Sequence, residues 1–206
     1  MLTRRTVMTT IAFASCLMTS PGLIRCAWAQ ADERAVAFIK GTSDQLVAIA
    51  NDEGSQQQKR HRLREVIDAS VDVDDIAHFC LGRFWRIATP DQQADYLALF
   101  HDLLVTKIAS HLGDYQGVRV IMGQARASGD TEIVITKVVR PENPVIQVEW
   151  VISIATGSPR IVDLLAEGTS LRLTQRADFA SYLTHHQYNV QDLIDGMRHL
   201  VALNGS

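Results

Sequence analysis

The chain has 206 residues, of which 47% are hydrophobic, 21% charged and 6% aromatic, a composition that excludes a disordered polymer and a bundle of membrane helices. Its 20 lysines and arginines stand against 23 aspartates and glutamates, which gives a formal charge of -3. A basic nucleic-acid-binding module is therefore disfavoured, and no nucleic acid partner is expected.

The first 29 residues have the order of a secretory signal peptide. Arg4 and Arg5 form a positive start, an apolar run extends from Val7 to Met18, and Ala27-Trp28-Ala29 has the small-x-small pattern that signal peptidase reads. We expect cleavage after Ala29 or two residues later, and a single mature domain over 30–206. Residues 3–8 also resemble a twin-arginine signal, so the Sec and Tat export routes both stay open.

The thiol content agrees with a domain that has no internal disulfide. Cys16 and Cys26 belong to the predicted signal peptide, so Cys80 is the only cysteine of the expected mature chain. Its neighbours Phe79 and Leu81 are apolar, which is typical of a buried cysteine that acts as a small hydrophobic residue.

Helical spacing of apolar residues predicts three helices over 32–51, 56–70 and 73–87. Thr89-Pro90-Asp91-Gln92 then combines an N-cap, a proline at the first helical position and a glutamine three residues after the cap. A long fourth helix is expected to begin there and to end at Gly113. Its apolar face repeats every three or four residues and consists of Tyr96, Leu99, Phe100, Leu103, Leu104, Ile108 and Leu112.

After Gly113 the apolar period changes to two, which predicts four antiparallel strands over 118–122, 132–139, 145–154 and 160–165. In the third strand Val148, Trp150 and Ile152 share one face with Ile146 and Ile154, and the other face is polar. Helical spacing returns over 170–185 and 190–203. The expected fold class is α+β, with a four-stranded antiparallel sheet packed against N- and C-terminal helices.

Signatures of common enzymes and metal sites are missing from the sequence. It has no phosphate-binding loop, no Gly-x-Ser-x-Gly elbow, no Cys-x-x-Cys and no His-Glu-x-x-His. His185 and His186 are read as a polar helix end, because neighbouring side chains on a helix point in different directions. The basic run over 59–64 is read as a solvated helix face, with docking to an acidic partner or to anionic headgroups as an alternative. We expect no enzyme activity, no cofactor and no metal.

Two segments carry a family resemblance. Residues 81–92, Leu-Gly-Arg-Phe-Trp-Arg-Ile-Ala-Thr-Pro-Asp-Gln, resemble a stretch typical of the MlaC, or toluene-tolerance, family of periplasmic lipid carriers. Residues 161–170, Ile-Val-Asp-Leu-Leu-Ala-Glu-Gly-Thr-Ser, are similar to that family's second signature, and 174–179 continue the match. The first stretch is also compatible with the hopanoid-associated HpnM subgroup. The chain departs from the family at 186–189, His-Gln-Tyr-Asn, where members often have a glycine pair.

The resemblance implies a periplasmic protein that carries phospholipid, or a hopanoid, in an apolar cavity between the sheet and the helices. It also implies two membrane partners, an inner-membrane ABC transporter complex with lipid-binding domains and an outer-membrane lipoprotein complex. The expected lipid-binding residues lie on the sheet face and the long helix, with Trp85 near the mouth: Trp85, Tyr96, Phe100, Leu104, Ile108, Val148, Trp150 and Ile152.

Two other readings stay open from the sequence. A small enzyme acting on an apolar substrate would use Asp163 and Glu167, which alternate along the predicted fourth strand and its end. The competing interpretation is that Asp163 binds loop or helix-end amides and that Glu167 orders the turn at Gly168. An assembly factor without ligand would have an ordinary, fully packed core at the same positions.

Overall fold

The structure is a computed structural model that describes residues 22–204. Residues 1–21, which hold the arginines and the apolar run of the predicted signal peptide, lie outside the described residues, and no side chain before residue 33 is described. The helices of the described part are α1 (Gly22–Ala50), α2 (Gln56–Ser70), α3 (Val73–Leu81), α4 (Pro90–His111), α5 (Leu171–His185) and α6 (Val190–Asn204), with short 3₁₀ helices η1 (Gly82–Arg86) and η2 (Leu112–Tyr115). The strands are β1 (Arg119–Ser128), β2 (Thr131–Val139), β3 (Ile146–Ser153), β4 (Arg160–Ala166) and β5 (Thr169–Ser170).

The predicted α+β class is confirmed, but the sheet has five strands, not four. Its order is β1-β2-β3-β4-β5, and every neighbouring pair is antiparallel. The extra strand β5 folds back on β4 around Glu167 and Gly168, whose φ angles are 49° and 78°. Two consecutive residues with positive φ make the tight two-residue turn that joins antiparallel strands. The prediction ended the sheet at Gly168 because a two-residue strand is too short to show a period.

Strand β1 is longer than the predicted 118–122 because a bulge interrupts its alternation. The register with β2 shifts between Met122 and Ala125. Gly123 lies in this bulge, and a Cβ atom built there would be 2.7 Å from the carbonyl oxygen of Ile135. The close approach of two backbones therefore requires glycine at this position.

The third predicted helix, 73–87, is divided at Gly82. Gly82 has φ of 56°, which an α-helix does not allow, so α3 ends at Leu81 and η1 follows. The predicted start of the long helix at Thr89–Gln92 is confirmed. Thr89 Oγ1 accepts a hydrogen bond from the Gln92 amide, and Gln92 Oε1 accepts one from the Thr89 amide. This capping box, with Pro90 at the first turn, fixes where α4 begins.

The turn between α5 and α6 contains the departure from the family pattern. Gln187 and Tyr188 have φ of 54° and 63°, in the left-handed region that glycine adopts at no steric cost. The chain thus keeps the backbone shape that a glycine pair would favour, but with two larger residues.

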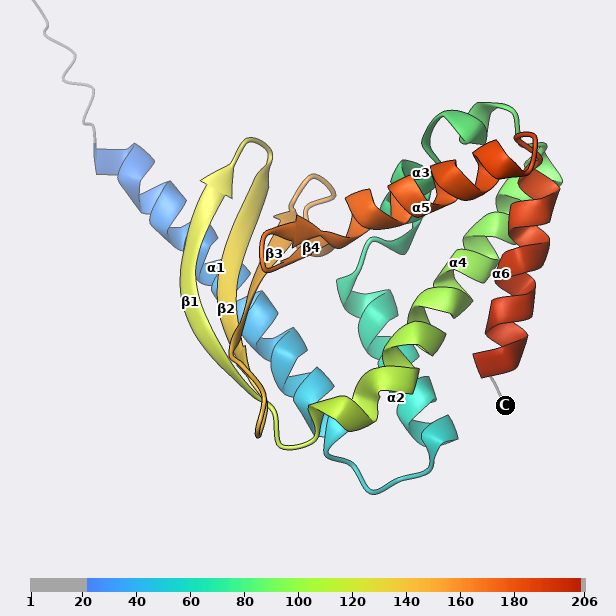
Figure 1. Cartoon of the computed structure of the whole chain (residues 1–206). Helices are drawn as coiled ribbons and strands as arrows, with labels where there is room; N and C mark the ends of the chain where they lie inside the picture. Colours follow the sequence, from blue (N-terminus) through green and yellow to red (C-terminus); the bar gives the residue numbers. More distant parts are fainter. Residues whose placement is uncertain (1–21, 205–206) are drawn as a thin grey trace, which may run out of the picture.

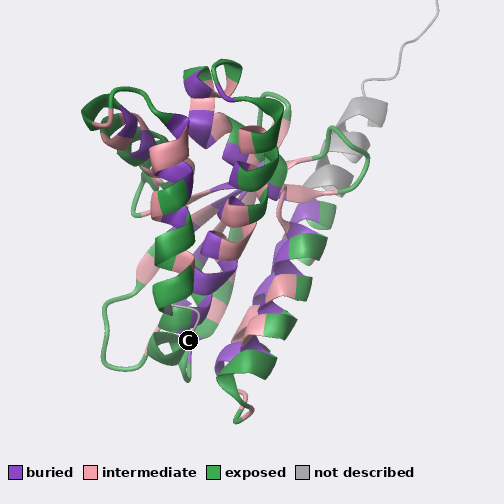
Figure 2. Cartoon of the chain, turned by 90° about the vertical axis from the view of Figure 1, so that its right-hand side faces the viewer, coloured by how far each residue is buried: buried purple, intermediate pink, exposed green. Residues whose placement is uncertain are grey.

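The hydrophobic interior is divided into two main clusters. Helix α1 crosses one face of β1 and β2, and Ala35 and Ile39 pack there against apolar side chains of the sheet (Figure 1). The end of α1 and helices α2 to α6 form a second, all-helical cluster to one side of the sheet. Figure 2 shows the buried residues of α1 along its inner face and the exposed ones along its outer face. A parallel bridge from Val71 to Ile161 ties the helical part to β4.

Candidate functional site

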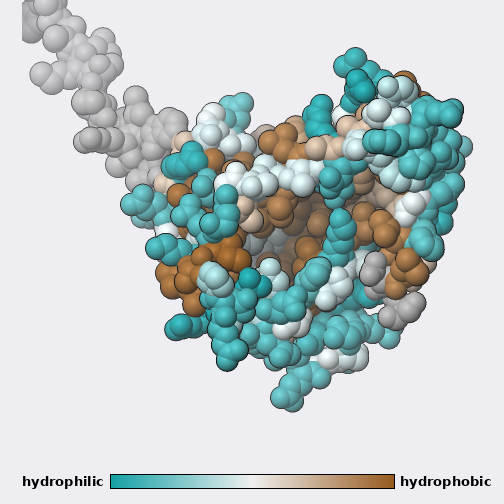
Figure 3. All heavy atoms as spheres, in the orientation of Figure 1, coloured by the Kyte–Doolittle hydropathy of each residue, from teal (hydrophilic) through white to brown (hydrophobic). Residues whose placement is uncertain are grey.

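The surface is hollowed between the strands and the helical cluster. Figure 3 shows this hollow near the centre of the face, with hydrophobic residues inside it and mostly hydrophilic residues around its rim. The two hydrophobic clusters meet at Leu46 and Val71, which are partly buried side chains that pack against both. An apolar hollow with a hydrophilic rim is typical of a binding site.

The sheet contributes the face that the sequence pattern identified. Val148, Trp150 and Ile152 of β3 all belong to the cluster between the sheet and α1, and each is at most 9% exposed. The Trp150 indole N–H donates to Thr136 Oγ1 at 2.9 Å, and the Thr136 hydroxyl donates to the Val148 carbonyl at 3.3 Å. Both buried polar groups are thus satisfied within the sheet, so the ring face stays apolar.

Helix α4 becomes less covered toward its C-terminal end. Tyr96 is fully buried and Phe100 is 6% exposed, whereas Leu104 is partly buried and Ile108 is 37% exposed. The first two rings pack edge-on against Phe179 of α5, with centroids 6.1 and 6.2 Å away. Helical spacing places Leu104 and Ile108 one turn apart on the same strip. The four residues predicted as one wall therefore divide into a packed half and an open half.

Tyr96 is further fixed by a hydrogen bond. Its hydroxyl donates to the Ala77 carbonyl of α3 at 2.9 Å, and burial raises its pKa. This side chain holds α3 against α4 within the helical cluster.

Trp85 lies at the other end of α4 from Ile108. Its ring centroid is 3.7 Å from that of His78, and its carbonyl accepts a hydrogen bond from Gln93. It packs against the helical cluster and not against the sheet residues. The predicted site residues therefore fall into both clusters, and the structure does not bring them into one continuous wall. The residues that join the clusters, Leu46 and Val71, gave no separate signal in the sequence because each fits an ordinary apolar pattern.

The two carboxylates considered as catalytic acids are both bonded to backbone amides. Buried Asp163 accepts from the Leu164 and Arg172 amides at 2.8 and 3.2 Å and from the Ser170 hydroxyl at 2.6 Å, and it is paired with the Arg172 side chain at 3.5 Å. Glu167 accepts from the Gln147 amide at 2.6 Å. Asp163 thus anchors the start of α5, and Glu167 orders the turn before β5, as the competing interpretation expected.

Cys80 is buried in α3, and its thiol contacts the Arg172 carbonyl at 3.5 Å. Burial raises the pKa of this thiol to about 12. A neutral thiol is a poor nucleophile, so its structural role as a small hydrophobic residue agrees with the sequence reading.

The basic run of α2 is only partly a solvated face. Arg62 is paired with Asp52, and Arg64 with Asp102, while Lys59 is buried. Lys59 is thus a correction to the expected solvent position, since it lies on the same side of the helix as Leu63 and Val66.

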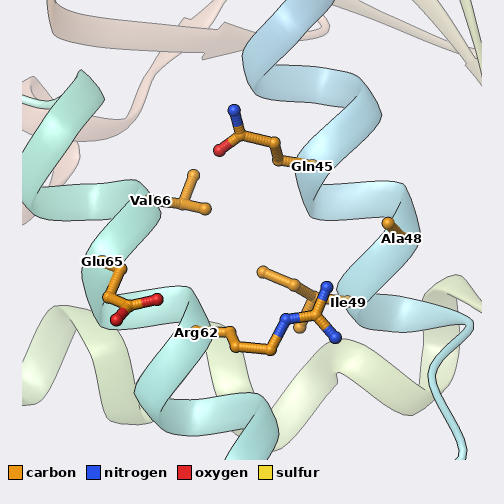
Figure 4. Close-up of a pocket in the computed structure, with 6 residues that line it drawn as sticks. All are labelled: Gln45, Ala48, Ile49, Arg62, Glu65 and Val66. Carbon is orange, nitrogen blue, oxygen red and sulfur yellow. The ribbon is translucent and has the colours of Figure 1, made fainter.

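A separate pocket of about 240 Å³ lies between α1 and α2 (Figure 4). Gln45, Ala48 and Ile49 come from α1, and Arg62, Glu65 and Val66 from α2. Its volume is below the roughly 300–1,000 Å³ of ligand sites, and half of its lining is polar or charged. It does not suit a long apolar ligand.

The described residues show neither a metal-binding cluster nor a membrane-spanning helix. No group of three or more histidines, cysteines, aspartates or glutamates is placed to hold a metal ion there. His185 and His186 each bond a carbonyl of their own helix at 2.8 Å, as expected of a polar helix end. Among the described helices, none combines the length and apolar character needed to cross a membrane.

Comparison with known proteins identifies a family and a similar solved structure. The family model described as MlaC protein matches residues 40–199. Among solved structures, a phospholipid-binding protein from Ralstonia solanacearum, determined in complex with a phospholipid, is similar with a TM-score of 0.71 and 21% sequence identity. The match covers 84% of this chain and 99% of that chain, so the two share a fold over that length.

Proposed function

Because the chain belongs to the MlaC family, we propose that it is a non-enzymatic carrier that holds a phospholipid with its acyl chains in the hollow between sheet and helices. The headgroup remains at the rim. The single observation that carries the proposal is the incompletely covered junction of the two hydrophobic clusters at Leu46 and Val71. A structural relative that contains phospholipid supports the choice of ligand.

The energetics explain why such a carrier is needed. Each methylene moved from an apolar site into water costs ~0.8 kcal/mol, so an acyl chain of about sixteen carbons costs ~12 kcal/mol to expose. A lipid therefore does not cross an aqueous compartment alone at a useful rate. An apolar hollow with a hydrophilic rim, as Figure 3 displays, offers the tails an environment without water and leaves the headgroup solvated.

The lining is assigned to the less covered part of each wall. In this proposal Leu104 and Ile108 of α4 line the site, Val148 and Trp150 of β3 form the opposite wall, and Leu46 and Val71 join the two. Partly buried Ile146 and Leu164 extend the sheet wall. Tyr96, Phe100 and Ile152 act as the packed support behind this surface, and Trp85 packs against the helical cluster at the other end of α4.

The family also suggests the cellular setting. In this proposal the protein works in the periplasm after removal of the signal peptide, and it exchanges lipid between an inner-membrane ABC transporter complex and an outer-membrane lipoprotein complex. A hopanoid is the alternative cargo, because the same apolar hollow would take a fused-ring tail.

The test is native mass spectrometry of the protein recovered from the periplasm, followed by organic extraction and identification of the lipid. We expect one phospholipid per chain. A clean protein mass, together with no uptake of labelled phospholipid from vesicles, would contradict the proposal, and an extracted hopanoid would replace the cargo.

A pair of variants localises the site. Ile108→Asp puts a charge on a residue that is already 37% exposed, so the fold should persist while an acyl chain can no longer lie beside it. Leu203→Asp is the matched control, since Leu203 is 63% exposed on α6, a helix that packs on α4 and not on the sheet. We expect at least a tenfold loss of bound lipid in the first variant and none in the second. Equal lipid content in both would place the site elsewhere.

A further inference from the structure

The segment after α3 and the turn between α5 and α6 lie close together at the upper right of Figure 1, and arginine contacts link these elements. We define the arginine patch as Arg83 and Arg86 of η1 and Arg176 of α5, together with the rings of Phe79 and Tyr188. All three arginines are exposed. Because a 3₁₀ helix repeats every three residues, Arg83 and Arg86 lie on the same side of η1.

Two of the three guanidinium groups, those of Arg83 and Arg176, lie over aromatic rings. Arg176 lies 4.8 Å from the centre of the Phe79 ring, and Arg83 lies 4.8 Å from Phe84 and 5.9 Å from Tyr188. A Cβ atom on Gly82 would be 3.1 Å from the Arg176 guanidinium, so the glycine leaves room for it. A ring binds the flat face of a guanidinium and leaves its N–H edges free to donate to an anion.

The patch differs from five other arginines of the described residues in its lack of carboxylate partners. Within the described part of the chain, ion pairs are recorded for Arg62, Arg64, Arg126, Arg172 and Arg198. No such pair is recorded there for the three arginines of the patch. In a chain with more acidic than basic residues, this leaves a local concentration of unneutralised positive charge.

Backbone strain keeps an aromatic ring in the same place. Tyr188 is 49% exposed and has φ of 63°, a conformation that costs a non-glycine residue ~1 kcal/mol. Its ring stacks on Phe84 with centroids 6.0 Å apart and contacts Arg83. Strain of this kind is found where a side chain is held for a purpose other than stability.

Exposed aliphatic side chains stand beside the charges. Leu173, which is 56% exposed, is one helical turn from Arg176, and Ile87, which is 60% exposed, directly follows Arg86. Arginines, an aromatic ring and exposed aliphatic side chains together are typical of a surface that lies on a membrane, with cations at lipid phosphates and apolar side chains between headgroups. An acidic protein partner would match the charge but not the scattered, protruding apolar residues.

We propose that the arginine patch docks this protein on the surface of an anionic phospholipid bilayer, with Arg83, Arg86 and Arg176 donating to lipid phosphates. The surface belongs to α3, η1 and α5, whereas the hollow lies between the sheet and the C-terminal half of α4. Membrane docking and lipid retention are therefore separable properties.

The experiment uses the protein recovered from cells after its natural processing. It is co-sedimented with vesicles of phosphatidylcholine alone or of phosphatidylcholine mixed with phosphatidylglycerol. Wild type should bind the mixed vesicles and be released by salt, because exposed charges are screened. Arg83→Gln with Arg86→Gln should lower the affinity about thirtyfold, which corresponds to ~2 kcal/mol. The control, Arg119→Gln with Arg126→Gln on edge strand β1, changes the net charge equally and should keep the wild-type affinity.

Further variants separate docking from fold and from cargo. Tyr188→Gly should leave the melting temperature unchanged or raise it, since strain is relieved, and should still weaken vesicle binding. Ile108→Asp should lose bound lipid but still bind vesicles. Arg83→Gln with Arg86→Gln should keep bound lipid but bind vesicles more weakly. Equal weakening by both double variants, binding that salt does not reverse, or binding of poly-glutamate without binding of vesicles would overturn the proposal.

Discussion

Asp163, a single residue of one family signature, has a structural role. Its carboxylate accepts hydrogen bonds from two backbone amides and from the Ser170 hydroxyl, and it is paired with the Arg172 side chain. Only 6% of the residue is exposed. Ser170 in turn caps α5 by accepting from the Leu173 amide. The acid therefore joins β4 to the first turn of α5, which explains a structural requirement for aspartate without any catalytic step.

Replacing each acid by its amide tests this interpretation. In the wild type, hydrogen-bond donors contact both carboxylate oxygens of Asp163, but Asp163→Asn keeps only one oxygen that can accept. We therefore expect the free energy of unfolding to fall by about 2–3 kcal/mol. Glu167→Gln is the control, because its remaining oxygen can still accept from the Gln147 amide, and it should change stability by less than about 0.5 kcal/mol. Urea denaturation followed by circular dichroism measures both. Similar losses in the two variants would refute the anchoring role.

At the scale of elements, the sheet is shaped by a few backbone positions more than by its apolar pattern. The bulge at Gly123 bends the edge strand β1, and the turn at Glu167 and Gly168 adds β5. The sequence predicted strands 2 to 4 to within a few residues because each keeps a period of two. It shortened β1 because Gly123 interrupts that period, and a bulge depends on a partner strand that the local sequence does not contain.

The bulge gives a prediction at this scale. In Gly123→Ala the new Cβ would approach the Ile135 carbonyl oxygen to 2.7 Å, so one backbone must shift, and we expect destabilisation of about 1–3 kcal/mol. Gly113→Ala is the matched control, since nothing lies within 4 Å of its Cβ position, and it should be neutral or slightly stabilising. Thermal denaturation of the two variants compares them directly. A neutral Gly123→Ala would show that β1 can move away from β2.

In the molecule as a whole, two hydrophobic clusters are packed separately and meet at Leu46 and Val71, which remain only partly buried. Protein interiors are normally close-packed, so a surface hollow lined by apolar residues is a stability cost unless something fills it. The aromatic packing of Tyr96, Phe100 and Phe179 shows that the helical cluster is well filled on its own. The cost is therefore local to the junction.

Removal of bound lipid should thus weaken one region of the molecule. A ligand that binds only the folded state stabilises it, by about 2.7 kcal/mol at a hundred times its dissociation constant. We expect delipidated protein to melt at a lower temperature, and its amide hydrogens to exchange faster in the C-terminal half of α4 than around Tyr96. Hydrogen exchange with mass spectrometry reads both segments, and reloading with phospholipid should restore protection. Uniform loosening, or none, would argue against a junction that lipid fills.

Features that depend only on neighbours in the chain could be predicted from the sequence. The α+β class and the family could both be predicted, because they rest on local patterns. These patterns are caps such as Thr89 with Gln92, the change of period after Gly113 and the two family signatures. The tertiary structure alone decided which apolar faces meet. Tyr96 and Ile108 share a periodic strip, yet Tyr96 is enclosed by α3 and α5 whereas Ile108 is 37% exposed. Periodicity shows that a face is apolar, whereas long-range packing decides whether that face is covered by protein or left for a ligand.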